Sequence, residues 1–558
     1  MSLPLTLTII LPLLGAVGTL ILSLVPRFRP YTRYVALTAV GLTTILILRL
    51  RWVEPVPVIP SVWQPSSLFG ATLTLQNDAM MQPLAFVLAL MSFGAVLVAL
   101  SRAENLHSRL AAALLALLSA SLIVLWAANS LTMIVSWAIY DLLQAAGHVA
   151  AGGSARTAIR GFVFGSLATL LLWGGTTLPS GGASSQSWSL IEPDDVQLTL
   201  WAMAGVLRLW VYPLHLATPD DLDTVPSPAM LLLLGPVIGW GLWLRLASAN
   251  GGSIPGGTWV PTLAVATLAV GGFLAWSCRS PRSMLPWIGM MVTGAVLLAA
   301  GLAGEGAAAV ISTGSVAWAL GVGVIFLSDG LQQESPWWNL PALVGSLTLM
   351  GLPLTLGFVT EAILIGGLTM EDPLRRRVAF FVGNLFLIPS LVRWLLSPRL
   401  LSASSASPPD TCRPDSCRQH PWPLVARGIG LGLPALLLIV AGFYPPLLVA
   451  RWNRRGLPLS LGKLFAMPSL AGWLLWAISL AGGGMLAWQE GNLRPRIEFL
   501  LSAAHDLLRL DWLYDAVVGA LNRGLSVLRA ADEVIRGTGA LLWSWLLFLT
   551  FLLVGGGK

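Results

Sequence analysis

The chain has 558 residues, of which 56% are hydrophobic and 10% are charged, and its net charge is +7. Soluble proteins carry roughly 25% charged residues, so this composition excludes an ordinary water-soluble protein. The positive charge is modest and spread along the chain, which argues against binding of nucleic acid. We therefore expect a protein that is embedded in a lipid bilayer over most of its length.

Long apolar segments follow one another along the chain and predict its membrane spans. Residues 79–100 contain no charged side chain and, at about 1.5 Å per residue, can cross a hydrocarbon core of about 30 Å as a helix. Such segments are too long and too uniformly apolar for barrel strands, so we predict an all-α polytopic membrane protein with about 15–16 transmembrane helices. The predicted spans are 3–25, 33–50, 79–101, 109–127, 130–149, 158–176, 198–216, 228–247, 259–277, 284–303, 307–328, 341–369, 378–398, 423–446, 466–487 and 540–555.

The distribution of basic residues predicts the orientation of these spans. Arginines follow the odd-numbered spans, for example Arg27, Arg102 and Arg279. The positive-inside rule places these loops in the cytoplasm and the N-terminus outside, although the basic clusters in 375–377 and 451–463 fall on the opposite side. The first span lacks a basic leading segment, so we predict a retained helix rather than a cleaved signal. A prokaryotic plasma membrane and a thylakoid are both compatible with these features.

The segment 494–539 differs from the predicted spans. It mixes apolar residues with many acidic and basic ones, so it is too charged to cross a membrane. This mixture predicts a lateral amphipathic helix that lies along the membrane surface, with interruptions at Asp511-Trp512 and Gly524. The last predicted span then returns the chain to the membrane.

Ionisable residues inside apolar spans are costly and are therefore candidates for function. Arg208 precedes Pro213, which lacks a backbone donor and can break the span so that carbonyls face a polar cavity. Arg208 either belongs to an ion path or extends to the membrane interface. Asp141 lies in an otherwise apolar span and either pairs with Arg208 or caps a kink. For Arg245 and Arg393, near the ends of their spans, we expect extension to the interface.

A second predicted break contains Pro353 and Gly357 and is followed by Glu361. A buried carboxyl group can bind and release protons, so Glu361 is a candidate for proton transfer. The alternative is a carboxylate that is stabilised by the dipole at the start of a helix.

Three further polar residues, His215, Asp220 and Asp221, follow the first break. They form either an access funnel for ions or an ordinary solvated loop. The sequence contains no nucleotide-binding loop, metal cluster, haem motif or hydrolytic triad, so we expect no cofactor, no metal and no catalytic site in this chain. Cys412 and Cys417 share a polar linker in which a disulfide can form, but their spacing is not that of a zinc site.

In the order of these motifs, the chain resembles the large antiporter-like membrane subunits of complex I (NADH or plastoquinone dehydrogenase) and of Mrp-type cation/proton antiporters. The resemblance is that of a divergent member of this family. The stretch 208–228 is similar to the family block Lys-x-Ala-x-x-Pro-x-His-x-x-Leu-Pro-Asp followed by Pro-Thr-Pro, and 351–361 is similar to the family's second broken helix. The matching positions of the first block are Pro213-Leu-His215, Pro219-Asp220 and Pro226-Ser-Pro228. The resemblance covers nearly the whole chain.

The resemblance implies two inverted helical repeats and an ion path of buried lysines, histidines and glutamates. Arg208 occupies the lysine position of the first broken helix, and Glu361 occupies the terminal charged position of the second. Ala138 stands where the family has its key glutamate, with Asp141 about one helical turn further on. The span 306–328, where a central lysine is expected, contains no ionisable side chain. Because arginine hardly deprotonates, these departures predict a degenerate proton path.

The resemblance also implies the organisation of the chain. Between 109 and 398 we expect an antiporter-like core of two inverted repeats, preceded by N-terminal transmembrane helices. The predicted parts are 1–108, 109–398, a loop at 399–422, C-terminal transmembrane helices at 423–493, the lateral helix at 494–539 and a final transmembrane helix at 540–558.

The leading functional hypothesis is an antiporter-like subunit of a complex I-related or Mrp-type ion-translocating complex, with a coupling or docking role. Its expected partners are other membrane subunits, lipid, and protons or monovalent cations, with no nucleic acid. Any NAD(P)H or ferredoxin:quinone oxidoreductase activity would then belong to the complex. The alternatives are a divergent cation/proton antiporter or inorganic-carbon uptake subunit, and a non-conducting structural scaffold.

Overall fold

The computed structural model describes residues 3–53, 57–59, 72–101, 107–178, 188, 192–331, 335–368, 374–396, 422–449, 459–536 and 544–550. The chain divides into two compact units, Met1–Glu498 and Phe499–Lys558. The described residues are almost entirely helical, and their only sheet is a two-stranded antiparallel pair of β1 (Pro57–Val58) and β2 (Leu75–Gln76).

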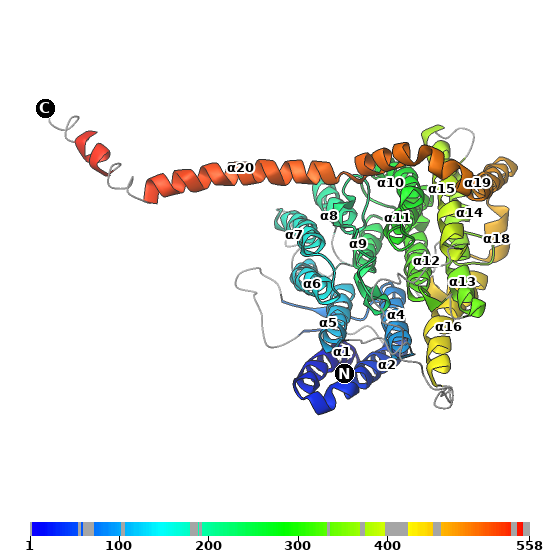
Figure 1. Ribbon diagram of the computed structural model, residues 1–558, viewed down its shortest axis with the longest axis horizontal. Coiled ribbons are helices and arrows are strands. Elements are labelled where there is room, and N and C mark those ends of the chain that lie inside the picture. Colours follow the sequence, from blue (N-terminus) through cyan, green and yellow to red (C-terminus); the bar gives the residue numbers. More distant parts are fainter. Residues whose placement is uncertain are drawn as a thin grey trace. The chain divides into compact units, whose positions relative to one another are not determined.

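The helices follow one another along the chain (Figure 1). In chain order they are α1 (Leu3–Leu24), η1 (Pro26–Tyr31), α2 (Thr32–Leu50), α4 (Gln82–Ser101), α5 (Ser108–Leu125), α6 (Ser130–Ala150), α7 (Ala155–Thr177), α8 (Asp195–Arg208), η2 (His215–Ala217), η3 (Ser227–Leu232), α9 (Pro236–Ala249), α10 (Trp259–Ser277), α11 (Leu285–Leu302), η4 (Gly304–Gly306), α12 (Ala307–Leu327), η6 (Pro336–Trp338), α13 (Asn339–Leu349), α14 (Phe358–Gly367), α15 (Leu374–Leu396), α16 (Trp422–Phe443), α17 (Pro446–Val449), α18 (Leu461–Ala466), α19 (Leu470–Arg509) and α20 (Asp511–Arg536).

The predicted membrane spans correspond to these helices. Among the described residues, 12 helices are long and apolar enough to cross a membrane. Most of the last predicted span, 540–555, lies outside the described residues. Its described part, 544–550, is helical. Every other predicted span coincides with a helix or with a broken pair of helices. The chain is therefore an all-α, multi-pass integral membrane protein, as predicted.

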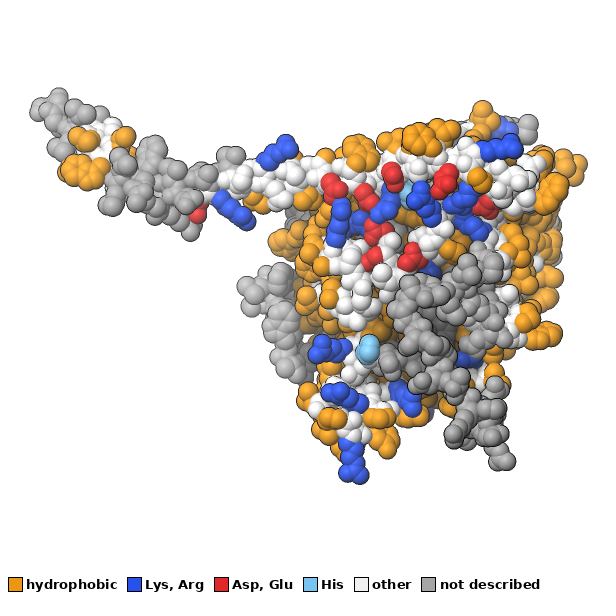
Figure 2. Space-filling view, viewed as in Figure 1, with side chains coloured by type: hydrophobic (Ala, Val, Ile, Leu, Met, Phe, Trp, Pro, Cys, Tyr) orange, Lys and Arg blue, Asp and Glu red, His pale blue; other side chains and the backbone are white. Residues whose placement is uncertain are grey.

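The first unit is a bundle with an apolar outline. Within it, α10 packs against α11 and α15, α4 packs against α16, and α1 packs against α2 and α5. The span that contains α12 is fully buried, whereas the span that contains α1 is mostly exposed. On the visible face, most acidic side chains and many basic ones gather in one band, and further basic side chains lie away from it (Figure 2). Hydrophobic side chains form much of the outline (Figure 2). Exposed leucines on such an outline are stable when lipid surrounds them.

Two interruptions in the helices lie at the predicted breaks. The first separates α8 from α9 and contains Pro213, and the second separates α13 from α14 and contains Pro353. In the second break, Gly351 has φ 65° and Leu354 has φ 68°. Positive φ values do not occur inside a right-handed helix, so the chain must leave helical geometry there.

The end of the chain differs in two respects from the prediction. The lateral helix was expected to begin at residue 494, but α19 runs without interruption for 40 residues from Leu470 to Arg509, with Pro495 inside it. The next helix, α20, begins at Asp511 after Leu510, whose φ is 59°. The predicted interruption at Asp511 is thus a helix boundary, whereas Gly524 lies within the continuous α20.

Candidate functional site

Asp141 and Arg208, which are 67 residues apart, form a buried ion pair at the first break. Asp141 lies in the middle of α6, and Arg208 is the last residue of α8. The two nitrogens at the end of the guanidinium donate to the two carboxylate oxygens, with 2.7 Å from Nη2 to Oδ2. Nη2 also donates to Thr169 Oγ1 and to the Gly165 carbonyl at 3.1 Å each. Of the two alternatives for Asp141, the structure therefore has the pair with Arg208.

Two glycines leave space for this pair, and a tryptophan ring covers its guanidinium. A Cβ atom at Gly165 of α7 would lie 2.5 Å from Asp141 Oδ1, and one at Gly239 would lie 2.8 Å from Arg208 Cβ. The Arg208 guanidinium also lies over the Trp137 ring, 4.3 Å from its centre. Only 7% of Arg208 and 2% of Asp141 are exposed. The guanidinium is therefore enclosed and does not reach a membrane interface.

His215 lies beyond the first break, inside a group of aromatic rings. Its ring stacks on Tyr212 with 5.2 Å between centres and meets the edge of Trp287 at 5.5 Å. Only 1% of His215 is exposed. Its carbonyl accepts a hydrogen bond from the Thr218 hydroxyl group. His215 therefore lies in an aromatic environment, and its place in an ion path stays a prediction.

The acidic residues Asp220 and Asp221 are paired with the corner between α6 and α7. Asp220 forms an ion pair with Arg160 at 3.1 Å, and Asp221 contacts the His148 ring at 2.9 Å. Burial would raise the pKa of Asp221, but hydrogen bonds from His148 and from the Ser154 backbone outweigh it and lower the pKa to about 2. Both carboxylates thus connect the loop to α6 and α7, and a role for them in ion entry stays a prediction.

His148 also contributes to this site, although it was not among the residues predicted from the sequence. It lies on α6 two turns after Asp141, a spacing that places both on one face of the helix. A small cavity of about 30 Å³ lies between them and is also lined by Gln144 and Gly161. A water molecule needs roughly 10–15 Å³ of such volume, so the cavity has room for one or two waters. In the sequence, the spacing of two helical turns between Asp141 and His148 was the one signal that could have indicated His148.

Glu361 lies in the first turn of α14, directly after the second break. Its Oε1 accepts a hydrogen bond of 3.1 Å from the Asn384 amide of α15, and 6% of Glu361 is exposed. A Cβ atom at Gly357 would lie 1.8 Å from the Thr348 carbonyl oxygen, and one at Gly351 would lie 2.7 Å from Glu361 Cβ. The glycines of this break therefore permit the close approach that buries the carboxyl group.

Apolar and aromatic side chains of α12 occupy the region where a central lysine was expected. Every residue of α12 is buried, and none is ionisable. Trp318 donates its indole N–H to the Gly289 carbonyl at 2.8 Å. The edge of its ring meets Trp210 of the first break, with 6.2 Å between centres. The indole of Trp318 thus fills space beside the break and has its hydrogen bond satisfied within the protein.

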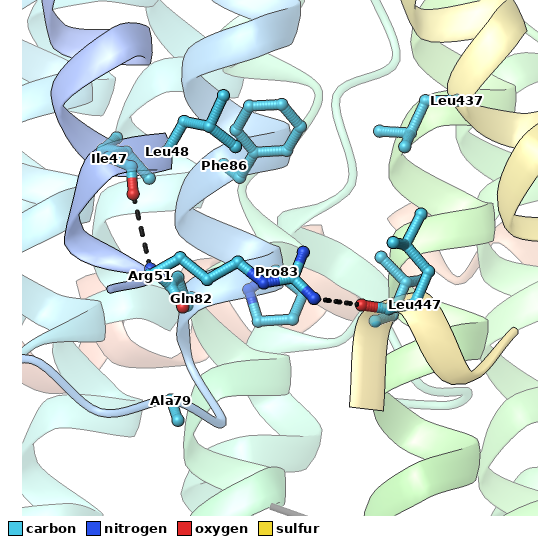
Figure 3. Close-up of a pocket in the computed structure, with 10 residues that line it drawn as sticks. Ile47, Leu48, Arg51, Ala79, Gln82, Pro83, Phe86, Leu437 and Leu447 are labelled. Carbon is cyan, nitrogen blue, oxygen red and sulfur yellow. Dashed lines mark hydrogen bonds between the residues drawn. The ribbon is translucent and has the colours of Figure 1, made fainter. Parts of the chain in front are cut away.

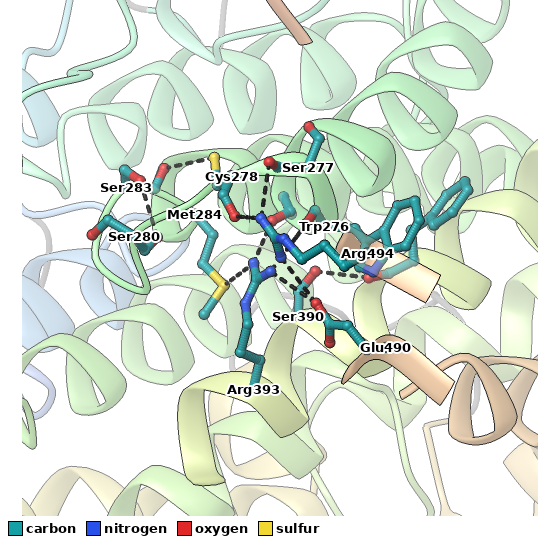
Figure 4. Close-up of polar contacts among 12 residues, drawn as sticks. Trp276, Ser277, Cys278, Ser280, Ser283, Met284, Ser390, Arg393, Glu490 and Arg494 are labelled. Carbon is teal, nitrogen blue, oxygen red and sulfur yellow. Dashed lines mark hydrogen bonds and ion pairs between the residues drawn. The ribbon is translucent and has the colours of Figure 1, made fainter. Parts of the chain in front are cut away.

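A further charged cluster joins α10, α15 and α19 (Figure 4). Arg393 and Arg494 each contact the same oxygen of Glu490 at 2.9 Å. They also donate to the carbonyls of Trp276 and Ser277 at the end of α10, each at 3.2 Å. The final carbonyls of a helix lack partners within the helix, so these arginines satisfy them. This cluster was not predicted from the sequence, in which Arg393 was expected to extend to the membrane interface.

Arg245 is buried rather than extended to the interface. It donates to the carbonyls of Leu125 and Ala127 at 2.6 and 3.0 Å, and 4% of it is exposed. Its guanidinium also lies 5.8 Å from the centre of the Trp188 ring.

Within the described ranges, no group of three or more His, Cys, Asp or Glu residues could hold a metal ion. Cys412 and Cys417 lie outside the described residues.

These features define a multi-pass helical membrane protein with two broken helices, each associated with a buried ionisable residue. No protein-family model matches the sequence. A chain of the Mrp complex from Dietzia sp. DQ12-45-1b is similar, with a TM-score of 0.77 and 17% identity over 99% of this chain and 62% of that one. This chain thus spans less than two thirds of the Mrp chain.

Two respiratory complexes contain similar chains. One is the membrane-bound sulfane sulfur reductase, an archaeal respiratory membrane complex, with a TM-score of 0.70 and 19% identity over 99% of this chain and 100% of that one. The other is respiratory complex I from Thermus thermophilus, with a TM-score of 0.60 and 18% identity over 79% and 98%. At these identities the likeness establishes a shared fold. The predicted resemblance to Mrp and complex I subunits is confirmed at that level.

Proposed function

We propose that this chain is an antiporter-like membrane subunit of a multi-subunit ion-translocating complex, in which its own proton path is degenerate. Its role is then to couple or dock neighbouring subunits. The observation that carries this proposal is the closed Asp141–Arg208 pair together with an α12 that has no ionisable side chain.

The chemistry of Arg208 supports a fixed charge rather than a proton carrier. A guanidinium stays protonated at all physiological pH values, whereas a lysine in a suitable site can release its proton. Two parallel contacts to Asp141, with further acceptors at Thr169 and Gly165, hold the group in one geometry. The pair therefore connects α6, α7 and α8 mechanically.

The contacts of α12 support an interrupted path between the two breaks. Protons move between ionisable groups or along water, and intramembrane polar groups usually mark such a path. Trp318, with its N–H bonded to Gly289 and its ring against Trp210, occupies this region with apolar surface. Glu361 of α14, directly after the second break, and Asn384 of α15 remain as a separate polar pair. The two polar regions are thereby separated.

The fold supports partners in the membrane. The similar chains come from the Mrp complex, an archaeal respiratory membrane complex and respiratory complex I. We expect other membrane subunits of such an assembly, together with lipid and protons or monovalent cations, as partners. The positive-inside rule favours an N-terminus outside the cytoplasm, in a prokaryotic plasma membrane or a thylakoid.

The experiment is to extract the protein from its native membrane in mild detergent and to identify the subunits that remain bound. We expect subunits of a complex I-like or Mrp-like assembly. Recovery of the chain alone, with pH-dependent cation flux in vesicles, would show an independent antiporter and refute the proposal.

The degenerate path is tested in the assembled complex. Ion flux per complex is measured in vesicles for Asp141→Asn and Glu361→Gln, with the exposed Glu305→Gln as the matched control. We expect all three variants to retain the flux of the unmodified complex once the amount of assembled complex is normalised. Loss of flux in Glu361→Gln but not in the control would contradict the degenerate path.

A further inference from the structure

An apolar groove runs along the surface of the first unit between α2, α4 and α16. Its larger part has a volume of about 690 Å³, and an adjoining part of about 270 Å³ continues it. The two parts share Leu48, Phe86 and Leu437. A volume of this size is in the range of pockets that hold small molecules.

The groove is longer than one membrane leaflet. On α2, its lining begins at Thr38 and ends at Arg51, which follows the last turn of that helix. These 13 steps correspond to about 20 Å along a helix, about two thirds of a hydrocarbon core of about 30 Å. The lining is apolar apart from Thr38, Thr44, Gln82 and Arg51. The groove therefore suits an extended hydrocarbon chain that enters from one membrane face.

Arg51 lies at the end of the groove where α2 leaves the membrane (Figure 3). Its Nη2 donates to the Leu447 carbonyl of α17 at 3.0 Å, which fixes the guanidinium between α2 and α17. A guanidinium has five N–H donors in a fork that matches a phosphate. Among the described residues, this contact uses one of them, and the remaining donors can bind an anionic group.

We propose that this groove binds one anionic phospholipid of the surrounding bilayer, with an acyl chain along α2 and its phosphate at Arg51. The apolar wall and the cationic end match the two parts of such a lipid in the same order along the membrane normal. A neighbouring transmembrane helix is the other occupant that an apolar groove can accept, but it would not need a cation at one end. The charge therefore favours the lipid.

The test uses the full chain, in its native assembly, transferred to detergent and then exposed to vesicles of phosphatidylglycerol or phosphatidylcholine. Native mass spectrometry counts the lipids that remain bound. We expect one phosphatidylglycerol per chain to be retained in preference to phosphatidylcholine. A Lys or Arg near anionic lipid contributes about 1 kcal/mol, so Arg51→Gln should weaken phosphatidylglycerol binding about fivefold.

Two variants keep the result interpretable. Arg49→Gln removes the same charge from an exposed arginine near the end of α2, outside the groove lining, and should retain the lipid. Leu437→Trp fills the region that the two parts of the groove share, so this variant should retain neither phosphatidylglycerol nor phosphatidylcholine. Equal loss in Arg49→Gln and Arg51→Gln, or equal retention of both lipids by the unmodified protein, would overturn the proposal. A retained protein segment in place of a lipid would overturn it as well.

Discussion

Replacement of Asp141 by asparagine isolates the contribution of the buried pair. Asparagine has nearly the same shape but no charge, so Arg208 would remain enclosed without a counter-ion. Both side chains are at most 7% exposed, and breaking a buried pair by removing one partner typically costs about 3–5 kcal/mol. We expect Asp141→Asn to lower the free energy of unfolding by an amount in this range.

The double variant with Arg208→Gln supplies the decisive comparison. Removing both charges of a buried pair is often close to neutral, because no unpaired charge remains. We therefore expect the double variant to be more stable than Asp141→Asn alone. The assay is unfolding by a denaturing detergent in micelles, followed by tryptophan fluorescence, for all four members of the cycle.

The result that would refute this reasoning is additivity. If the double variant lost the sum of the two single losses, the guanidinium of Arg208 would not depend on Asp141. The pair would then contribute no coupling energy, and its role in connecting α6 to α8 would have to be abandoned.

Two further predictions follow from local geometry. Gly165→Ala places a Cβ atom 2.5 Å from Asp141 Oδ1 and should lower the free energy of unfolding by about 1–3 kcal/mol. The control is Gly174→Ala on the same helix, which meets no atom within 4 Å and should not lower it. Equal thermal midpoints of the two variants would contradict the packing of the pair. For Asp221, the pKa of about 2 is below its usual value of 3.8, so the contact with His148 stabilises the protein above pH 4 and the stability is lost as pH falls toward 2. The difference in thermal midpoint between the unmodified protein and Asp221→Asn should therefore shrink as pH decreases from 5 to 2, and a constant difference would show that the carboxylate charge is not involved.

The sequence determined which segments form helices, and their order, because the bilayer leaves little choice. A backbone without water must satisfy its own hydrogen bonds, so each long apolar segment forms a helix. The two interruptions were also encoded locally, since Pro213 lacks a donor and Gly351 and Gly357 permit close backbone approach. Arg208 and Glu361 were identifiable because an ionisable residue is conspicuous inside an apolar segment.

Only the tertiary structure decided what these residues contact. Asp141 had two alternatives in the sequence, and the approach of α6 to α8 across Gly165 selected the pair with Arg208. Asp220 and Asp221 also had two alternatives in the sequence, an access funnel and a solvated loop, and in the structure they contact Arg160 and His148 at the corner between α6 and α7.

The same holds for Trp318, for Arg245 and for the groove beside Arg51. The hydropathy of a residue shows whether its side chain is apolar or charged, but it does not show which other helix will pack against that side chain. The Trp318 indole is bonded to α11 and Arg245 binds carbonyls of the connection after α5, contacts between segments that are distant in the sequence. The groove likewise exists only because α2, α4 and α16 meet. Local sequence fixes which segments cross the membrane, and the packing of those segments determines which charges are paired and which surfaces stay open.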